Sequence, residues 1–222
     1  GIQALINSVN LLKNKANVDQ KCALHYHYGN IPRTKEFIVS FWIAITMLQD
    51  DLFKYQLAYK KDNRGFKTKD YSKPLPNLLR KFDKVLTGES LTKAYDVIIE
   101  YLSMGLYGRG TMPSLEAINS HPADPNGTQK WHIKTRYYMA NLIPLIFCNK
   151  KTVEFRHHDV SLNPNLVINE MVINALILRF VLDNQENILK GQATFDLPNI
   201  IQKYSSDKDY DNLFQLLKEF ES

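Results

Sequence analysis

The chain consists mainly of long segments with helical spacing of apolar residues, separated by a few short segments in which apolar and polar residues alternate. Apolar positions that recur every three to four residues are typical of amphipathic helices. This spacing predicts helices over residues 2–17, 35–60, 76–86, 89–105 and 165–182. Two further short amphipathic helices are expected within residues 196–220.

Strand-like runs occupy a smaller part of the chain. The predicted strands cover residues 22–28, 131–136, 142–147 and 153–158. The polar turn Asn149-Lys-Lys151 separates the last two runs and is typical of an antiparallel hairpin. The polar segment 112–130 is expected to form a long loop of the kind that often carries function.

These elements together predict an α+β fold in which an antiparallel sheet packs against several helices. No internal repeat and no linker-like segment divides the chain. We therefore interpret residues 1–222 as a single domain. Residues 1–182 would form its motif-bearing core, and residues 183–222 a C-terminal helical segment.

Two of the predicted strands combine polar side chains on one face. Because side chains alternate across a strand, His25 and His27 share one face of the first strand. By the same rule, three residues share one face of the last strand, namely Glu154, Arg156 and His158. A solvated strand face usually carries Lys, Thr and Glu, so this set predicts a functional site.

These residue types suit metal-assisted phosphate chemistry. A carboxylate and imidazoles hold divalent cations, while arginine pairs with phosphate or carboxylate oxygens. A zinc site in a hydrolase is an alternative, since His25-x-His27 is a common zinc-binding fragment, but Arg156 would then have no role. A further alternative is purely structural: Glu154 and Arg156 would form an ion pair of modest energetic value.

Composition narrows the class of protein. The net charge of +5 comes from lysines and arginines that are scattered along the chain, so nucleic-acid binding is not expected. The two cysteines, Cys22 and Cys148, indicate a reducing compartment rather than a disulfide scaffold. No apolar run reaches the roughly 20 residues of a membrane helix. The sequence predicts a soluble, intracellular protein of the cytoplasm, an organelle or a virus, without a membrane partner.

Two motifs resemble those of the amidoligase family, whose members are carboxylate–amine ligases related to glutamine synthetase and glutamate–cysteine ligase. Cys22-Ala-Leu-His-Tyr-His-Tyr28 is similar to the family signature Cys-Gly-Leu-His-Val-His. Thr152-Val-Glu-Phe-Arg-His-His158 resembles its Thr-[Val/Ile]-Glu-Phe-Arg-x-His strand. Looser similarities involve Arg64, Arg136 and Asn141, and the resemblance extends over residues 1–182.

The resemblance implies a fold like the catalytic domain of glutamine synthetase and an ATP- and Mg²⁺-dependent ligase that forms an amide bond through an acyl phosphate. The implied metal-binding residues are His25, His27 and Glu154. The implied catalytic residues are Glu154, Arg156, His158 and Arg136. The implied cofactor-binding residues are His25, His27, Arg64 and Asn141. The substrates would be a carboxylate and an amine, either small molecules or peptides.

One feature of the family leaves a second interpretation open. The family normally begins with a strand whose Glu-x-Glu pair supplies metal-binding carboxylates, and that strand would precede Gly1. The alternative is therefore a catalytically inactive, amidoligase-like subunit that holds a larger assembly or a homo-oligomer together. In that case the polar strand faces are expected to be linked by ion pairs or packed against a partner.

Overall fold

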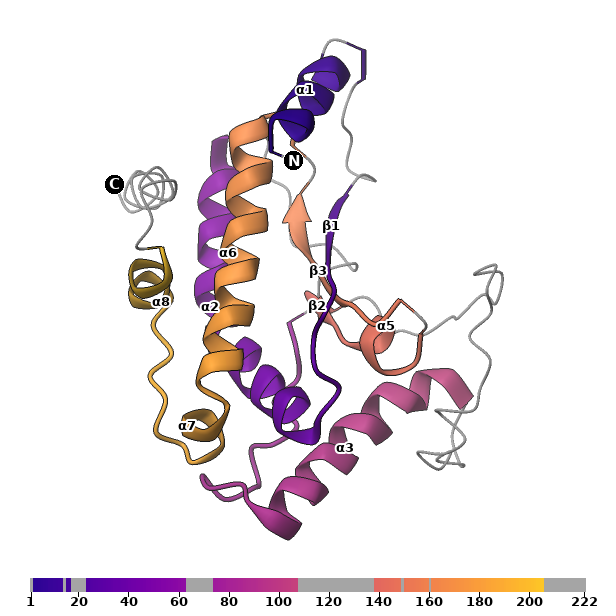
Figure 1. Ribbon diagram of the computed structural model, residues 1–222, viewed down its shortest axis with the longest axis vertical. Coiled ribbons are helices and arrows are strands. Elements are labelled where there is room, and N and C mark those ends of the chain that lie inside the picture. Colours follow the sequence, from indigo (N-terminus) through magenta and orange to yellow (C-terminus); the bar gives the residue numbers. More distant parts are fainter. Residues whose placement is uncertain are drawn as a thin grey trace.

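The structure is a computed structural model that describes residues 2–13, 15–16, 23–62, 74–107, 138–148, 150–159 and 161–205. Over this part of the chain, helices combine with a small antiparallel sheet, as the α+β prediction requires. The long helices α2 (Lys35–Asp62) and α6 (Pro164–Asp183) lie together on one side of the strands, and α3 (Gly88–Tyr107) crosses below them (Figure 1).

The described sheet has three strands in the order β1-β3-β2, so that β3 (Val153–Asp159) is central. Its neighbours are β1 (Ala23–Tyr28) and the two-residue strand β2 (Ala140–Asn141), both antiparallel to it. The register between β1 and β3 shifts between Leu24 and Tyr26, because Leu24 pairs with His158 and Tyr26 with Phe155. This irregularity is a β-bulge, in which one residue of β1 lies opposite two residues of β3.

Helix starts follow local capping rules. Thr34 precedes α2, and its Oγ1 accepts a hydrogen bond from the amide of Phe37 at 3.2 Å. Asn163 caps α6 in the same way by accepting from the amide of Asn165, and Pro164 occupies the first turn, where its missing N–H costs nothing. Local sequence therefore defines where the two helices that cover the sheet begin.

One face of β3 belongs to the core. Val153 and Phe155 are both fully buried, and the ring of Phe155 contacts Phe41 of α2 and Tyr28 of β1 in edge-to-face geometry. Tyr26 and Tyr28 lie on the same side, and their hydroxyls donate to the backbone carbonyls of Val167 and Met171 on α6. The sheet is thus fixed to α6 by hydrogen bonds as well as by apolar packing.

Most of the long predicted elements are confirmed. The helices expected at 35–60, 89–105 and 165–182 correspond to α2, α3 and α6, and β1 and β3 match their predictions within one residue. Helix α1 (Ile2–Lys13) ends earlier than predicted. Helix α8 (Leu197–Tyr204) is the first of the two expected near the C-terminus, and α7 (Gln185–Leu189) was not expected.

Two predictions are wrong. Residues 142–147 do not form a strand: β2 ends at Asn141 and the short helix α5 (Ile143–Ile146) follows, with Pro144 in its first turn. Proline lacks the N–H that a central ladder position requires. Residues 76–86 form turns instead of a helix. Their backbone groups form hydrogen bonds with other elements: the carbonyl of Pro76 accepts from the Trp42 side chain, and the amide of Leu86 donates to the carbonyl of Leu189.

Three further predictions concern residues outside the described part of the chain. They are the strand at 131–136, the loop at 112–130 and the second C-terminal helix.

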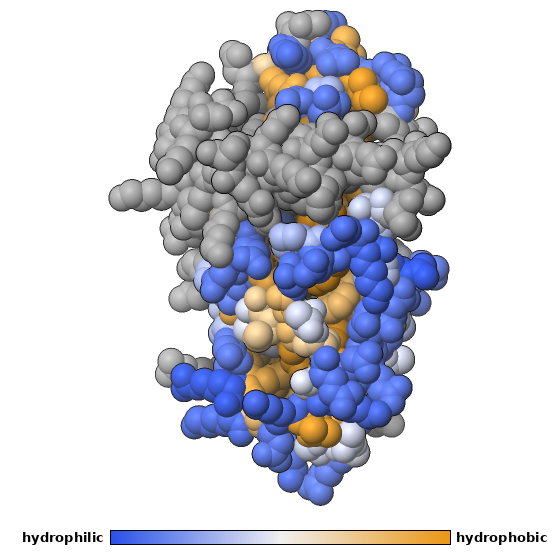
Figure 2. Space-filling model, turned by 90° about the vertical axis from the view of Figure 1, so that its left-hand side faces the viewer, coloured by the Kyte–Doolittle hydropathy of each residue, from blue (hydrophilic) through white to orange (hydrophobic). Residues whose placement is uncertain are grey.

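One described helix, α6, is long and apolar enough to cross a membrane by length and composition. In this structure α6 packs against α1, α2, α7 and α8. Apolar surface is visible between polar regions on the face that carries α8 (Figure 2). The exposed large apolar side chains among the described residues are Leu11, Leu12, Met47 and Val85.

Replacement of the central aromatic residue tests this packing. Phe155→Ala removes a fully buried ring and should lower the free energy of unfolding by roughly 3–5 kcal/mol, measured by urea denaturation. Met47→Ala on α2 is the control, because Met47 is exposed, and its effect should stay within about 0.5 kcal/mol. Equal effects of the two substitutions would contradict the assignment of Phe155 to the core.

Candidate functional site

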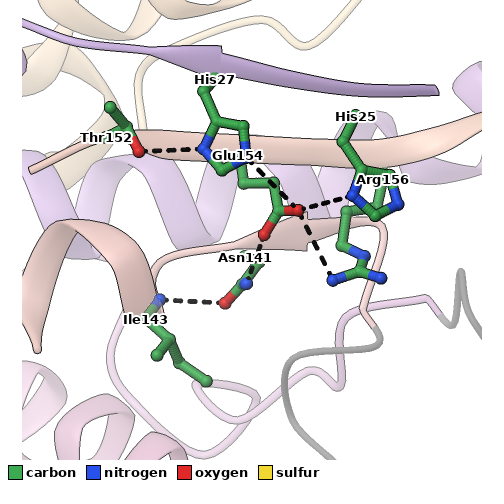
Figure 3. A network of polar contacts seen from close by, with 7 residues as sticks. All are labelled: His25, His27, Asn141, Ile143, Thr152, Glu154 and Arg156. Atoms are coloured by element: carbon green, nitrogen blue, oxygen red, sulfur yellow. Dashed lines mark hydrogen bonds and ion pairs between the residues drawn. The ribbon is translucent and has the colours of Figure 1, made fainter. Parts of the chain in front are cut away.

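The polar face of the sheet is organised around Glu154, at the centre of β3. The register places His27 of β1 directly opposite Glu154 on one side and Asn141 of β2 opposite it on the other. The three side chains therefore form one row across the sheet (Figure 3). With His25 and Arg156 they make up what we call the Glu154 cluster, whose members come from three different strands.

Four donor groups surround the Glu154 carboxylate. Its Oε1 lies 3.0 Å from His25 Nδ1, 3.5 Å from Arg156 Nη1 and 3.6 Å from His27 Nε2. Its Oε2 accepts a hydrogen bond of 2.7 Å from Asn141 Nδ2. Only 7% of the Glu154 side chain is exposed, so these groups replace the water that a carboxylate normally needs.

The β-bulge contributes to this arrangement. His25 lies where the register shifts, and Arg156 and His157 of β3 together occupy the positions opposite it. Bulges redirect side chains and are frequent beside functional sites. Here His25 and Arg156 reach the same carboxylate oxygen, while His157 is buried and its ring contacts Phe155 on the core side.

Asn141 connects the cluster to α5. Its Nδ2 donates to Glu154, and its Oδ1 accepts from the amide of Ile143, the first residue of α5, at 3.0 Å. The residue immediately before α5, Leu142, provides no side-chain cap, so Asn141 satisfies a helix N–H that would otherwise lack a partner. Asn141 is buried, and both ends of its amide are engaged within the protein.

Thr152 is a member of the site that the sequence did not assign. Its Oγ1 lies 3.0 Å from His27 Nδ1, on the side of the ring away from Glu154. Strand alternation could have placed Thr152 at the site, because Thr152 is two residues before Glu154 and therefore on the same face. The sequence could not indicate which residue it contacts, since that depends on the pairing of β1 with β3.

The structure brings together five of the eight residues predicted for the site, namely the members of the Glu154 cluster. Arg64 and Arg136 lie outside the described residues. The backbone of His158 pairs with Leu24 beyond the bulge, and its side chain is also outside the described part. Its assignment to the Glu154 face, which rests on strand alternation, therefore stays a prediction.

The contacts change how the cluster holds protons. Burial opposes ionisation of Glu154, but the hydrogen bond from His25, the charge of Arg156 and the hydrogen bond from Asn141 outweigh it and hold its pKa below the ordinary value. For His27, burial lowers the pKa, and the attraction of Glu154 only partly opposes this. The cluster therefore favours an ionised Glu154 beside a neutral His27.

The donor set suits an anionic ligand better than an isolated metal ion. Both oxygens of Glu154 already accept hydrogen bonds or ion pairs, whereas the two imidazoles are about one-third exposed. Within the described ranges, no group of three His, Cys, Asp or Glu side chains has the arrangement of a metal site. Neighbouring arginine and imidazole groups are typical of sites for phosphate or carboxylate oxygens.

Comparisons of this chain with protein-family models, with curated proteins and with solved structures found no match.

The pKa directions predict how stability depends on pH. His27 and Glu154 each have a pKa in the folded state below that in the unfolded state. The unfolded chain therefore binds more protons, and the free energy of unfolding falls as the solution is acidified. His27 should contribute a loss below pH 6.5, and Glu154 a second loss as the pH falls from 4.5 through its folded-state pKa. The measurement is urea denaturation between pH 8 and pH 3.

Glu154→Gln should remove the loss of stability at lower pH, and His27→Gln should remove the loss nearer neutral pH. The exposed Glu186, whose pKa is lowered by Lys190 on the surface of α7, provides a control in Glu186→Gln. A wild-type profile retained in Glu154→Gln would contradict the assigned protonation states.

Proposed function

We propose that the protein is an ATP-dependent carboxylate–amine ligase that forms an amide bond through an acyl phosphate, on a sheet like that of the glutamine synthetase catalytic domain. The observation that carries this proposal is the convergence of His25, His27, Arg156 and Asn141 on Glu154, on the face of the sheet opposite the core. A ligase of this class needs cationic groups that stabilise the charge of a transferring phosphoryl group. The cluster supplies one such group, the guanidinium of Arg156, on the central strand β3.

Arg156 is the residue best suited to contact the phosphate or the substrate carboxylate. Its guanidinium has several N–H donors, and the ion pair with Glu154 uses Nη1. The pair fixes the direction of the side chain, which is 12% exposed. A positioned guanidinium loses less conformational entropy on binding than a freely moving one.

The described residues fit ATP phosphates more readily than they fit Mg²⁺ alone. Magnesium prefers carboxylate, phosphate and water oxygens, and the cluster has one carboxylate, already hydrogen-bonded. We infer that Mg²⁺ would be held mainly by phosphate oxygens, with Glu154 as its nearest protein carboxylate. Bound ATP would supply the phosphoryl group that activates the substrate carboxylate, while the chain's own residues bind and orient the reactants.

Nucleotide titration tests the proposal. Isothermal titration with a non-hydrolysable ATP analogue should show binding that requires Mg²⁺. Arg156→Ala should weaken it by about 10- to 100-fold, because a hydrogen bond to a charged group contributes about 1.5–3 kcal/mol. Arg156→Lys should give an intermediate loss, since lysine keeps the charge without the planar fork.

Arg179→Ala is the matched control, because Arg179 is an exposed arginine on α6 that pairs with Asp183. It should bind the analogue as the wild type does. Wild-type affinity in Arg156→Ala would show that the nucleotide binds elsewhere, and absence of binding to the unmodified chain would contradict the ligase proposal.

A second candidate is an inactive, ligase-like subunit of a larger assembly. The specific observation in its favour is that protein groups satisfy both oxygens of Glu154, so that ion pairs and hydrogen bonds link the polar face internally. This candidate predicts no Mg²⁺-dependent nucleotide binding, together with a destabilised protein in Glu154→Gln. Nucleotide binding that depends on Arg156 would exclude it.

A further inference from the structure

The two imidazoles of the Glu154 cluster have nearly the same exposure but different environments. The exposed fraction of the side chain is 36% for His25 and 35% for His27. His25 approaches Glu154 through Nδ1, whereas His27 approaches it through Nε2. A neutral imidazole has one N–H donor and one acceptor nitrogen, and a hydrogen bond to one nitrogen decides the role of the other.

His25 has one nitrogen engaged by the carboxylate. The Nδ1–Oε1 distance of 3.0 Å is that of a hydrogen bond, and an ionised carboxylate only accepts, so Nδ1 carries the proton. When the ring carries one proton, Nε2 therefore keeps its lone pair. This tautomer is the less common one for a free imidazole in water, so the contact with Glu154 selects it.

His27 has protein partners at both nitrogens. Nε2 faces Oε1 of Glu154 at 3.6 Å, and Nδ1 lies 3.0 Å from the hydroxyl of Thr152. The negative charge of Glu154 favours the tautomer with the proton on Nε2, and in this tautomer Nδ1 accepts from the Thr152 hydroxyl. In this tautomer, His27 has no acceptor nitrogen left for a ligand.

We propose that His25, through Nε2, is the imidazole that contacts the ligand, and that Thr152 and Glu154 are positioning residues that hold the two rings as opposite tautomers. A lone pair accepts a hydrogen bond, so the ligand group at His25 is a hydrogen-bond donor. In the proposed ligase reaction, on which this assignment of the ligand group rests, that group is the amine substrate. Arg156, which reaches the same carboxylate oxygen, lies beside it to receive the anionic group.

Chemical labelling of the free protein tests the tautomers. Diethyl pyrocarbonate modifies imidazole nitrogens that have an available lone pair, and both rings lie in one tryptic peptide, residues 22–33. At pH 8, mass spectrometry should show His25 labelled at least tenfold faster than His27. Because the exposed fractions of the two side chains are nearly equal, the ratio of the labelling rates depends on which ring nitrogen has an available lone pair and not on burial. Equal rates, or faster labelling of His27, would overturn the proposal.

Two variants of Thr152 separate positioning from stability. Thr152→Val keeps the shape but removes the hydroxyl, so Nδ1 of His27 is released and its labelling rate should rise toward that of His25. Thr152→Ser keeps the hydroxyl and should leave the ratio unchanged. Unaltered labelling in Thr152→Val would show that Thr152 does not position the ring, whatever its effect on unfolding.

Nitrogen NMR of the imidazoles then tests the ligand class. Methylammonium chloride, with sodium chloride as the ionic control, should shift the Nε2 resonance of His25 and leave His27 unchanged. No selective shift would overturn the amine assignment. The labelling experiment tests the tautomer assignment in the free protein. Nucleotide titration tests the ligase proposal separately, so the two can fail independently.

Discussion

The central strand β3 constrains the rest of the structure, because its two faces meet opposite environments. Val153 and Phe155 are fully buried against α2 and β1, while Glu154 and Arg156 project to the other side. A shift of one residue in the pairing would bury the charges among apolar side chains and expose the core residues. The hydrogen bonds of Tyr26 and Tyr28 to α6 add a second restraint on that register.

The Glu154 carboxylate in turn organises the polar face. A nearly buried carboxylate is costly unless donors surround it, and the donors come from β1, β2 and β3 itself. Each donor is oriented by the same contact that stabilises the charge. Asn141 extends this network to the start of α5, whose last carbonyl, that of Ile146, accepts from Arg33 in the segment before α2. Folding and site geometry therefore depend on the same contacts.

The sequence predicted the parts of this arrangement that depend on local pattern. Periodicity was sufficient for α2, α3, α6 and the two longer strands, and alternation correctly placed Glu154 and Arg156 opposite Phe155. It failed at 142–147, where apolar composition suited a strand, but Pro144 and the amide of Asn141 favour a helical turn. The bulge at His25 and the contact of Thr152 with His27 depend on the pairing of distant segments, which no local pattern contains.

Binding of a nucleotide at the Glu154 cluster is tested most directly by mapping the binding surface by NMR. Side-chain resonances of His25, His27 and Arg156 would be followed while a non-hydrolysable ATP analogue and Mg²⁺ are added. We predict that Arg156 shifts strongly while the exposed Arg179 on α6 does not. Shifts confined to α6 and α8, or no shifts at saturating nucleotide, would contradict it.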